Sequence, residues 1–328
     1  MNSIKVIPAV LLVALSGILL KGDVWTFWTW YLLAAVLGFL GMSVTGRMFR
    51  RFDDKGWVFS KVLSIAVTGF VTWLLVTAGI LPFTTATCIG VTVACGVLAL
   101  IFYERERKQG FESLPIDHLG LVYGEELLFF ALFLLWTYLA GFHPAAYGTE
   151  KFMDYGFMEA MMRSKTLPAT DLWYSGGKIN YYYGGQYFAV FFTRLSGTKV
   201  ELTYNLMRTF VAGLAFILPF SLVRQMVKDR LGKKNDGFKK ALPAVAGALS
   251  GVAVSIAGNM HYVIYAQIIP FIQKLTGQEV DSYWFPDATR YIGFNPENEV
   301  DKTIHEFPCY SFVLGLSLIH ISEPTRPY

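Results

Sequence analysis

Glu150 and Asp154 stand four residues apart, a spacing that places two carboxylates on one face of a helix. Like charges at this spacing destabilise each other unless a cation or a proton donor lies between them. A carboxylate held in this way can act as a general base on a substrate hydroxyl, or the pair can bind a cation. The alternative is a solvated helix face with no chemical role. We take Glu150 and Asp154 as the candidate catalytic residues.

The residues around this pair predict an amphipathic helix at a membrane surface. Thr149 is a suitable N-cap, and the negative charge of Glu150 is favourable in a first helical turn. Apolar or small residues recur at helical spacing at Met153, Phe157, Ala160, Met161 and Ser164. Glu159 and Arg163, four apart, predict an intrahelical ion pair. The two carboxylates are therefore expected on a short helix that lies on the membrane surface.

Three consecutive tyrosines follow in the stretch INYYYGGQ, residues 179–186. Tyrosine favours membrane interfaces because its ring is apolar and its hydroxyl prefers water. This preference accounts for one or two tyrosines, but three in succession point in three directions around a helix, and Asn180 has no such preference. Asp171 and Trp173 lie in the turn-rich connector before them. The sequence thus predicts hydroxyl, amide and ring contacts with a substrate here.

A second polar stretch, residues 281–312, contains Arg290, His305 and Glu306, which are able to bind a charged head group or a metal ion. The His305-Glu306 pair lacks the HExxH spacing of a zinc protease, and no Cys/His cluster accompanies it, so zinc is not expected. The metal site is unassigned, and a divalent cation is left open as a cofactor. The candidate substrate-binding residues are Lys151, Arg163, Asp171, Trp173, Asn180, Tyr181, Tyr182, Tyr183, Arg290, His305 and Glu306.

The composition indicates an all-α, polytopic integral membrane protein that positions these residues. The chain has 328 residues, of which 54% are hydrophobic and 16% charged, with a mean hydropathy of +0.43. A net charge of +4 comes from basic residues in short loops between apolar runs, so nucleic-acid binding is not inferred. Stretches long enough to span the bilayer predict about seven transmembrane helices, at 5–20, 24–46, 57–80, 84–103, 119–141, 201–223 and 241–264.

Basic residues in the short loops predict the orientation. Loops 47–55, 105–108 and 224–240 carry most of the positive charge and are expected in the cytoplasm, together with the N-terminus. The long loops, at about 142–200 and 265–315, then face the outside of the cell membrane. A crossing at Gly184–Gly197 would force the 224–240 loop outside, and its about 14 residues reach only roughly 21 Å as a helix. We therefore predict an interfacial or re-entrant helix there.

The stretches GTEKFMDYGFMEAMMRS, LPATDLW, GGKINYYYGGQ and TIHEFPCYSFVLG resemble the uncharacterised membrane protein family named for its tyrosine triplet, the Chlor_Arch_YYY domain. The resemblance covers about 119–315. Leu172 stands where the family usually has proline, and the Asp-Leu-His segment that follows the EFPxxSF motif in the family is missing. Residues 317–328 resemble the translation of a sequencing adapter and are excluded from the fold. The expected organisation is an N-terminal four-helix membrane region at 1–118, an incomplete YYY-type domain at 119–316 and a non-native tail at 317–328 of an N-terminal fragment.

That family is similar in layout to the GT-C membrane glycosyltransferases, which take sugars from polyprenyl phosphate carriers. The resemblance implies a GT-C-like fold with interfacial helices in a large outer loop, and a polyprenyl-phosphate-linked sugar as donor. Glu150 or Asp154 matches the acidic residue of that loop and would be the general base. Arg163, Lys178 or Arg290 would stabilise the departing phosphate.

Two other classes of function remain open from the sequence. Glu125 and Glu126 lie within the predicted fifth span, where carboxylates are functional candidates, so a transporter or flippase of a lipid-linked or small anionic substrate is one alternative. The other is a non-catalytic envelope protein whose aromatic loops hold a partner. In either case the lipid bilayer is the environment.

Overall fold

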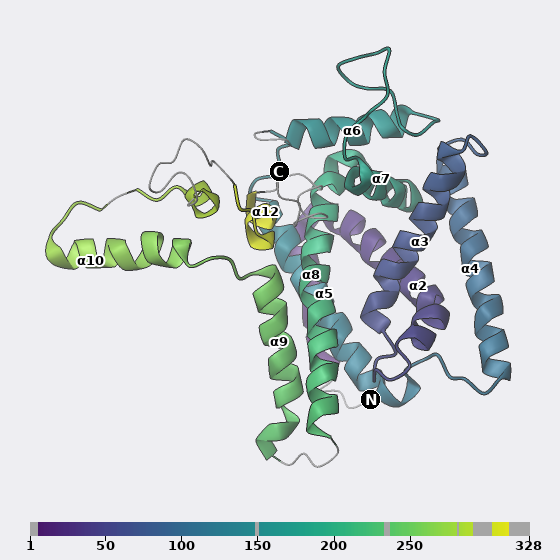
Figure 1. The fold of residues 1–328 in the computed structure, drawn as a ribbon, viewed down its shortest axis with the longest axis horizontal. Helices are drawn as coiled ribbons and strands as arrows, with labels where there is room; N and C mark the ends of the chain where they lie inside the picture. Colours follow the sequence, from purple (N-terminus) through teal and green to yellow (C-terminus); the bar gives the residue numbers. More distant parts are fainter. Residues whose placement is uncertain (1–5, 148–150, 233–236, 281, 291–303, 315–328) are drawn as a thin grey trace.

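The computed structural model describes residues 6–147, 151–232, 237–280, 282–290 and 304–314 (Figure 1). These residues form helices, and the one extended pairing among them is an isolated bridge between Thr170 and Lys178. The short turns are η2 (Lys21–Asp23), η3 (Ile116–His118), η4 (Gly237–Lys240), the π-helical η5 (Val263–Ile268) and η6 (Phe285–Thr289). The α-helices are α1 (Ile7–Leu20), α2 (Val24–Met48), α3 (Trp57–Thr77), α4 (Thr85–Lys108), α5 (Leu119–Ala140), α6 (Lys151–Arg163), α7 (Gly184–Ser196), α8 (Val200–Leu231), α9 (Leu242–Ser255), α10 (Ile269–Thr276) and α12 (Pro308–Leu314).

Five helical segments in the described part of the chain are long and apolar enough to cross a membrane. They are Ile7–Met48, Trp57–Thr77, Thr85–Lys108, Ile116–Ala140 and Val200–Leu231, and Leu242–Ser255 is a shorter apolar helix. Many of their large apolar side chains are exposed on the outside of the bundle. A lipid environment accounts for this exposure. The protein is therefore an all-helical, multi-pass membrane protein.

The first of these segments is bent back on itself at η2. Lys21 there has a positive φ of 47°, and the indole Nε1 of Trp28 donates a hydrogen bond of 3.1 Å to Ser16 Oγ. Twelve residues in a straight helix would separate these groups by roughly 18 Å. α1 and α2 are therefore two helices that meet at a bend, and this bend lies near the predicted boundary between 5–20 and 24–46.

α8 and α9 pack against each other through glycines. A Cβ at Gly247 would lie 2.7 Å from the carbonyl oxygen of Phe220, and one at Gly251 would lie 2.7 Å from the Phe216 ring. Small residues of this kind let membrane helices approach closely. The predicted span 241–264 is longer than α9, because the helix ends at Ser255 and Asn259 Oδ1 accepts a hydrogen bond of 3.2 Å from the His261 amide, which starts a new helical segment.

Two apolar clusters hold the bundle and its cover together. The first joins α2, α5 and α8 through aromatic pairs such as Phe27 and Phe133, whose ring centroids are 4.5 Å apart. The second surrounds α7, which packs against α6 and against α3 and α4. The Tyr187 hydroxyl of α7 donates a hydrogen bond of 2.7 Å to the carbonyl oxygen of Gly69 in α3. α7 is thus fixed to the bundle rather than extended through it.

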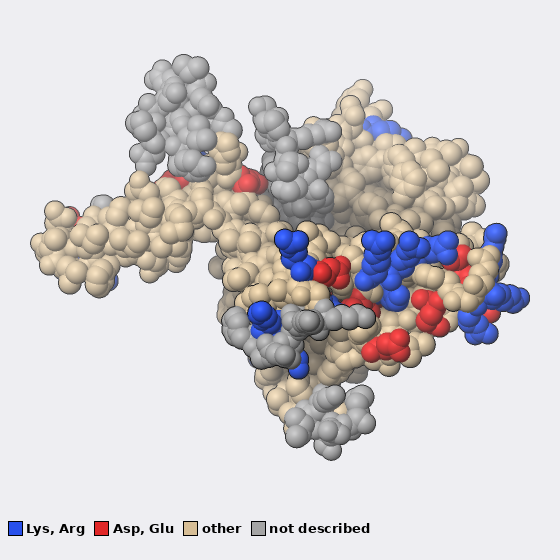
Figure 2. All heavy atoms as spheres, turned by 60° about the horizontal axis from the view of Figure 1, so that its bottom comes forward, with Lys and Arg blue, Asp and Glu red and all other residues tan. Residues whose placement is uncertain are grey.

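The two ends of the bundle differ in character. α6 and α7 lie across the upper end in Figure 1, whereas α4 and α8 end at the lower end. Figure 2 turns this lower end toward the viewer and shows Lys and Arg side chains gathered on it, with Asp and Glu among them. The predicted basic loops and the motif-bearing helices therefore lie at opposite ends, as the charge pattern requires.

Candidate functional site

The inner face of α6 carries two charged side chains among apolar ones. Lys151 is 9% exposed and Asp154 is 0% exposed, and Met158 and Met161 continue the same buried face. These positions are three or four residues apart, so they form one stripe on the helix. The amphipathic helix is present at Lys151–Arg163, but its charged residues 151 and 154 face the protein. Glu150 lies outside the described residues.

Asp154 is hydrogen-bonded to α7. The side-chain Nε2 of Gln186 donates to Asp154 Oδ1 at 2.6 Å, and both residues are fully buried. Gln186 is the last residue of the INYYYGGQ stretch and lies in the first turn of α7. It was not among the candidates from sequence. Its place at the end of that motif is the signal that could have identified it.

A second buried cation, Arg208 of α8, lies near Lys151 and Tyr204. Arg208 is 4% exposed and donates from Nη2 to Asn205 Oδ1 at 2.9 Å. Burial, and in addition the charge of Arg208, lower the pKa of the Lys151 amine. Tyr204, one turn earlier on α8, lies close enough to Asp154 and Arg208 to interact with both charges. Sequence reasoning missed Arg208, although an arginine inside an apolar span is a signal of function.

The site therefore combines one carboxylate with two cations from three helices. Lys151 and Asp154 come from α6, Gln186 from α7 and Arg208 from α8. Two buried cations suit an anionic group such as a phosphate. A carboxylate beside them suits proton transfer from a hydroxyl. Among the described residues no group of three or more His, Cys, Asp or Glu residues is arranged to hold a metal ion.

The tyrosine triplet is divided between anchoring and exposure. The Tyr183 hydroxyl accepts a hydrogen bond of 3.0 Å from Trp73 Nε1, which ties the start of α7 to α3. Tyr181 and Tyr182 are each 42% exposed, with ring centroids 5.1 Å apart. Asn180 beside them is also exposed. The first two tyrosines and Asn180 thus lie at the protein surface.

The connector between α6 and α7 is held by its own polar residues. Asp171 Oδ1 accepts hydrogen bonds from the amides of Trp173 at 2.8 Å and Tyr174 at 2.9 Å. Lys178 Nζ donates to Thr166 Oγ1 at 3.3 Å. Trp173 itself is 63% exposed. Asp171 and Lys178 therefore shape this loop, and Trp173 lies at its surface.

The remaining predicted residues lie away from Asp154. Arg163 is exposed and its Nη1 is 3.5 Å from Glu159 Oε2, which confirms the predicted intrahelical pair. Arg290 Nη1 donates to the Pro286 carbonyl at 3.1 Å, and its guanidinium lies over the Trp284 ring. His305 donates from its amide to the Thr289 carbonyl at 2.8 Å, and Glu306 is half-buried next to it. Arg290, His305 and Glu306 thus belong to the region of η6 and α12.

Glu126 lies in a separate polar cluster inside the bundle. It accepts hydrogen bonds from the Tyr31 hydroxyl at 2.7 Å and from Trp57 Nε1 at 2.5 Å, and it forms an ion pair with Lys61. Lys61 is 1% exposed. The sequence had pointed to Glu126 but not to Lys61, although a lysine within an otherwise apolar stretch is the same kind of signal as Arg208.

A family model described as "Uncharacterized membrane protein (DUF2298)" matches residues 67–316, which is most of the chain. The match begins within α3, continues through α12 and includes all the helices that form the site. No curated protein and no solved structure matches the chain.

Proposed function

Because this chain belongs to the DUF2298 family of uncharacterized membrane proteins, whose description states no reaction, we propose a function from the site itself. The protein is a membrane glycosyltransferase with a GT-C-like layout. It takes a sugar from a polyprenyl-phosphate carrier at the end of the bundle covered by α6 and α7. The observation that carries this proposal is the buried Asp154, held by Gln186, with the buried Tyr204 close to both Asp154 and the buried Arg208.

Each residue has a role that follows from its chemistry. Asp154 accepts the proton of the acceptor hydroxyl as the bond between the sugar and the phosphate breaks. Gln186 orients the carboxylate through its hydrogen bond. Lys151 and Arg208 stabilise the charge of the departing phosphate. They replace Arg163, Lys178 and Arg290 in this role, because those three side chains are engaged elsewhere.

Substrate entry requires movement of α6. Asp154 is fully buried between α6 and α7, so a hydroxyl reaches it only when the two helices separate. The exposed rings of Tyr181 and Tyr182 lie at the start of α7 and are suited to stack on a sugar or an isoprenoid at the entrance. The site is thus closed in this structure and opens for catalysis.

The proposal includes an orientation in the plasma membrane. The lower, basic end of the bundle faces the cytoplasm with the N-terminus, and α6 and α7 face outward. Counting α1, α2, α3, α4, α5, α8 and α9 as separate crossings gives the seven of the sequence prediction. A lipid-linked donor fits this orientation because nucleotide sugars are cytoplasmic substrates.

A transporter is the second candidate, and the ion pair between the buried Lys61 and Glu126 inside the bundle favours it. Charges of this kind inside a bundle mark substrate or ion pathways in membrane transport proteins. If the protein is a transporter, it moves a lipid-linked or small anionic substrate across the membrane without cleaving a bond.

One experiment separates these functions. Membranes containing the full chain are supplied with radiolabelled polyprenyl-phosphate sugars, and transfer by the wild type is compared with that by Asp154→Asn and Glu159→Gln. Glu159 is the matched control, because it is a more exposed carboxylate on the same helix. We expect Asp154→Asn to lower transfer roughly 10²–10⁴-fold at normal insertion, and Glu159→Gln to retain it. Arg208→Gln should also lose transfer, whereas Arg163→Gln should not.

Two results would overturn the enzyme proposal. Full transfer by Asp154→Asn would show that Asp154 is not the general base. Absence of transfer by the wild type from every donor, together with uptake of labelled substrate that depends on Glu126, makes transport the function. Glu150→Gln is measured in parallel, because this residue precedes α6.

A further inference from the structure

A second group of buried charges lies at the opposite end of the bundle from Asp154. It forms where the loop between α2 and α3 meets α5 and α8. Asp54 of this loop and Glu125 of α5 are each 1% exposed. They are close enough for their charges to interact, and the Arg224 guanidinium, the Lys61 amine and the Ser221 hydroxyl also lie near Glu125. The proposed reaction uses none of these residues.

Of the three carboxylates that lie inside the bundle here, Asp54 and the partly exposed Glu126 have hydrogen-bond donors. Asp54 Oδ1 accepts from the Gly56 amide, and Asp54 Oδ2 accepts from the Ser221 hydroxyl, both at 3.1 Å. Glu126 accepts from Tyr31, Trp57 and Lys61. By contrast, no hydrogen bond with normal geometry reaches either carboxyl oxygen of Glu125 from a described residue, because the nearby Ser221 hydroxyl is directed to Asp54.

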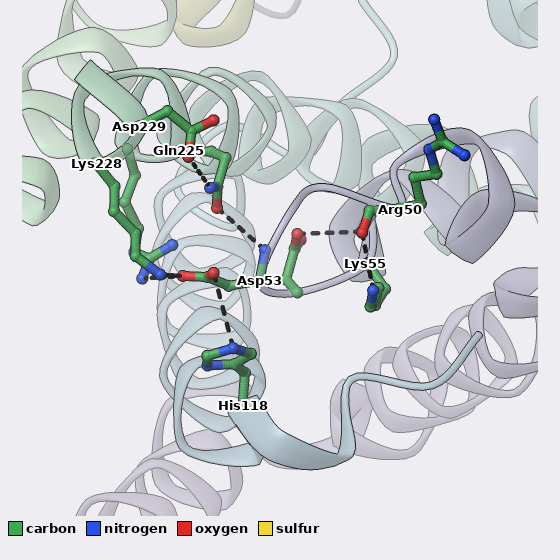
Figure 3. A network of polar contacts seen from close by, with 10 residues as sticks. Arg50, Asp53, Lys55, His118, Gln225, Lys228 and Asp229 are labelled. Atoms are coloured by element: carbon green, nitrogen blue, oxygen red, sulfur yellow. Dashed lines mark hydrogen bonds and ion pairs between the residues drawn. The ribbon is translucent and has the colours of Figure 1, made fainter. Parts of the chain in front are cut away.

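The cations near Glu125 are already paired with other carboxylates. Lys61 forms its ion pair with Glu126. Arg224 Nη2 lies 3.3 Å from Asp53 Oδ2, and Lys228 also pairs with Asp53. Figure 3 shows Asp53 between Lys228 and His118, whose Nε2 is 3.8 Å from Asp53 Oδ1. The guanidinium and the amine near Glu125 are therefore not aimed at it.

The charges of this cluster do not balance without a proton. Its carboxyl groups are Asp53, Asp54, Glu125 and Glu126, and its permanent cations are Lys61, Arg224 and Lys228. Four negative charges thus face three positive ones when His118, which is nearly half exposed, is neutral. An ionised carboxylate that is buried, without hydrogen bonds and beside another carboxylate is strongly unfavourable.

We propose that Glu125 is a proton-binding site, whose carboxyl group is protonated and neutral in the folded protein, which leaves three negative charges against three positive ones in this cluster. The site is independent of the glycosyltransferase proposal. Its proton affinity depends on the loop between α2 and α3, because Asp54 favours the bound proton and Arg224 opposes it. Movement of this loop away from α5 and α8 would therefore be coupled to release of the proton into the basic end.

Infrared spectroscopy of the full chain in lipid vesicles tests the proposal. A protonated carboxylic acid has a carbonyl stretching band distinct from that of a carboxylate. We expect this band in the wild type at neutral pH, its loss in Glu125→Gln, and its retention in Glu104→Gln, which changes an exposed carboxylate of α4. A wild-type spectrum without the band, or a band that persists in Glu125→Gln, would overturn the proposal.

Titration of two further variants tests the assigned neighbours without altering Glu125. Asp54→Asn removes a negative charge, so the band should disappear at a lower pH than in the wild type. Arg224→Gln removes a positive charge, so the band should persist to a higher pH. A band that titrates identically in all three proteins contradicts the proposed site, and this result does not require Glu125→Gln to fold.

Discussion

Gln186 donates its side-chain Nε2 to Asp154 Oδ1 at 2.6 Å, and this contact joins the two stretches of sequence with the clearest chemical character. One is the helix that begins after Glu150, and the other is the tyrosine stretch that ends at Gln186. Both residues are fully buried. The hydrogen bond therefore fixes α6 on α7 and sets the orientation of the carboxylate at the same time.

We expect Gln186→Leu to lower the stability of the protein by about 1–3 kcal/mol, because it leaves a buried carboxylate without this donor. Thermal unfolding in lipid or detergent measures the change. Asn180→Ala is the control, because Asn180 is an exposed amide six residues earlier in the same stretch. Equal unfolding temperatures for the two variants would show that the contact contributes nothing to the fold.

Helix positions were largely predictable because they depend on local sequence. A crossing needs an apolar run of sufficient length, so α3, predicted at 57–80, forms at Trp57–Thr77. The periodicity after Glu150 predicted α6, and the shortness of the run after Gly184 predicted that α7 does not cross. α9 is shorter than predicted because Gly258 and Asn259 interrupt an apolar run that hydropathy alone treats as continuous.

The site was predictable only in part, because it forms between helices that are distant in sequence. Asp154 was proposed from its spacing to Glu150 on one helix, and Lys151 was among the candidate substrate-binding residues. Arg208 and Gln186 were not, because their roles depend on how α8 and α7 pack under α6. The same reason explains Lys61, whose partner Glu126 lies 65 residues further along the chain.

The close packing of α8 on α9 predicts a large effect at Gly247. In Gly247→Ala the new methyl group would lie 2.7 Å from the backbone oxygen of Phe220, which cannot turn away as a side chain can. We expect a loss of about 1–3 kcal/mol in stability from this overpacking. Gly90→Ala in α4 is the matched control, since no atom lies within 4 Å of its new Cβ. Alanine favours a helix over glycine, so Gly90→Ala should unfold at the same temperature or higher. Unfolding temperatures of the two variants in the same lipid decide the comparison.

The ion pairs of Asp53 at the basic end are expected to contribute to stability in a pH-dependent way. Burial raises its pKa, but the hydrogen bond and charge of Lys228, with the charges of His118 and Arg224, outweigh burial and hold the pKa below its ordinary value. A carboxyl group whose folded pKa is lowered stabilises the protein above its unfolded pKa, which is about 3.9. This stabilisation is lost as the pH falls through the lower pKa of the folded state.

We therefore expect Asp53→Asn to be less stable than the wild type at neutral pH, and the difference to shrink as the pH is lowered below about 3.9. Unfolding midpoints measured over a pH series give this difference directly. Asp117→Asn, at an exposed position in η3, should follow the wild type throughout. A constant difference between Asp53→Asn and the wild type at every pH would rule out the ion pairs as its source.

α10 is predicted to lie in the membrane surface. Figure 1 shows this helix projecting away from the bundle, across the direction of α9. Its large apolar side chains are exposed, with Phe271 at 61%, Ile272 at 49% and Leu275 at 71%. Ile272 and Lys274 are two residues apart and so lie on nearly opposite sides of the helix. An amphipathic helix with this arrangement lies in the membrane surface with its apolar side in the lipid.

Spin labels on Ile272→Cys and Lys274→Cys, in a protein whose Cys88, Cys95 and Cys309 are replaced, measure this directly. We expect oxygen dissolved in the bilayer to relax the label at position 272 more strongly, and a water-soluble nickel chelate to relax the label at position 274. The two labels are adjacent on one short helix, so a difference between them reports the face and not the depth of the whole segment. Equal access of the nickel chelate to both positions would mean that α10 extends into water, and its exposed apolar side chains would then need a protein partner in place of lipid.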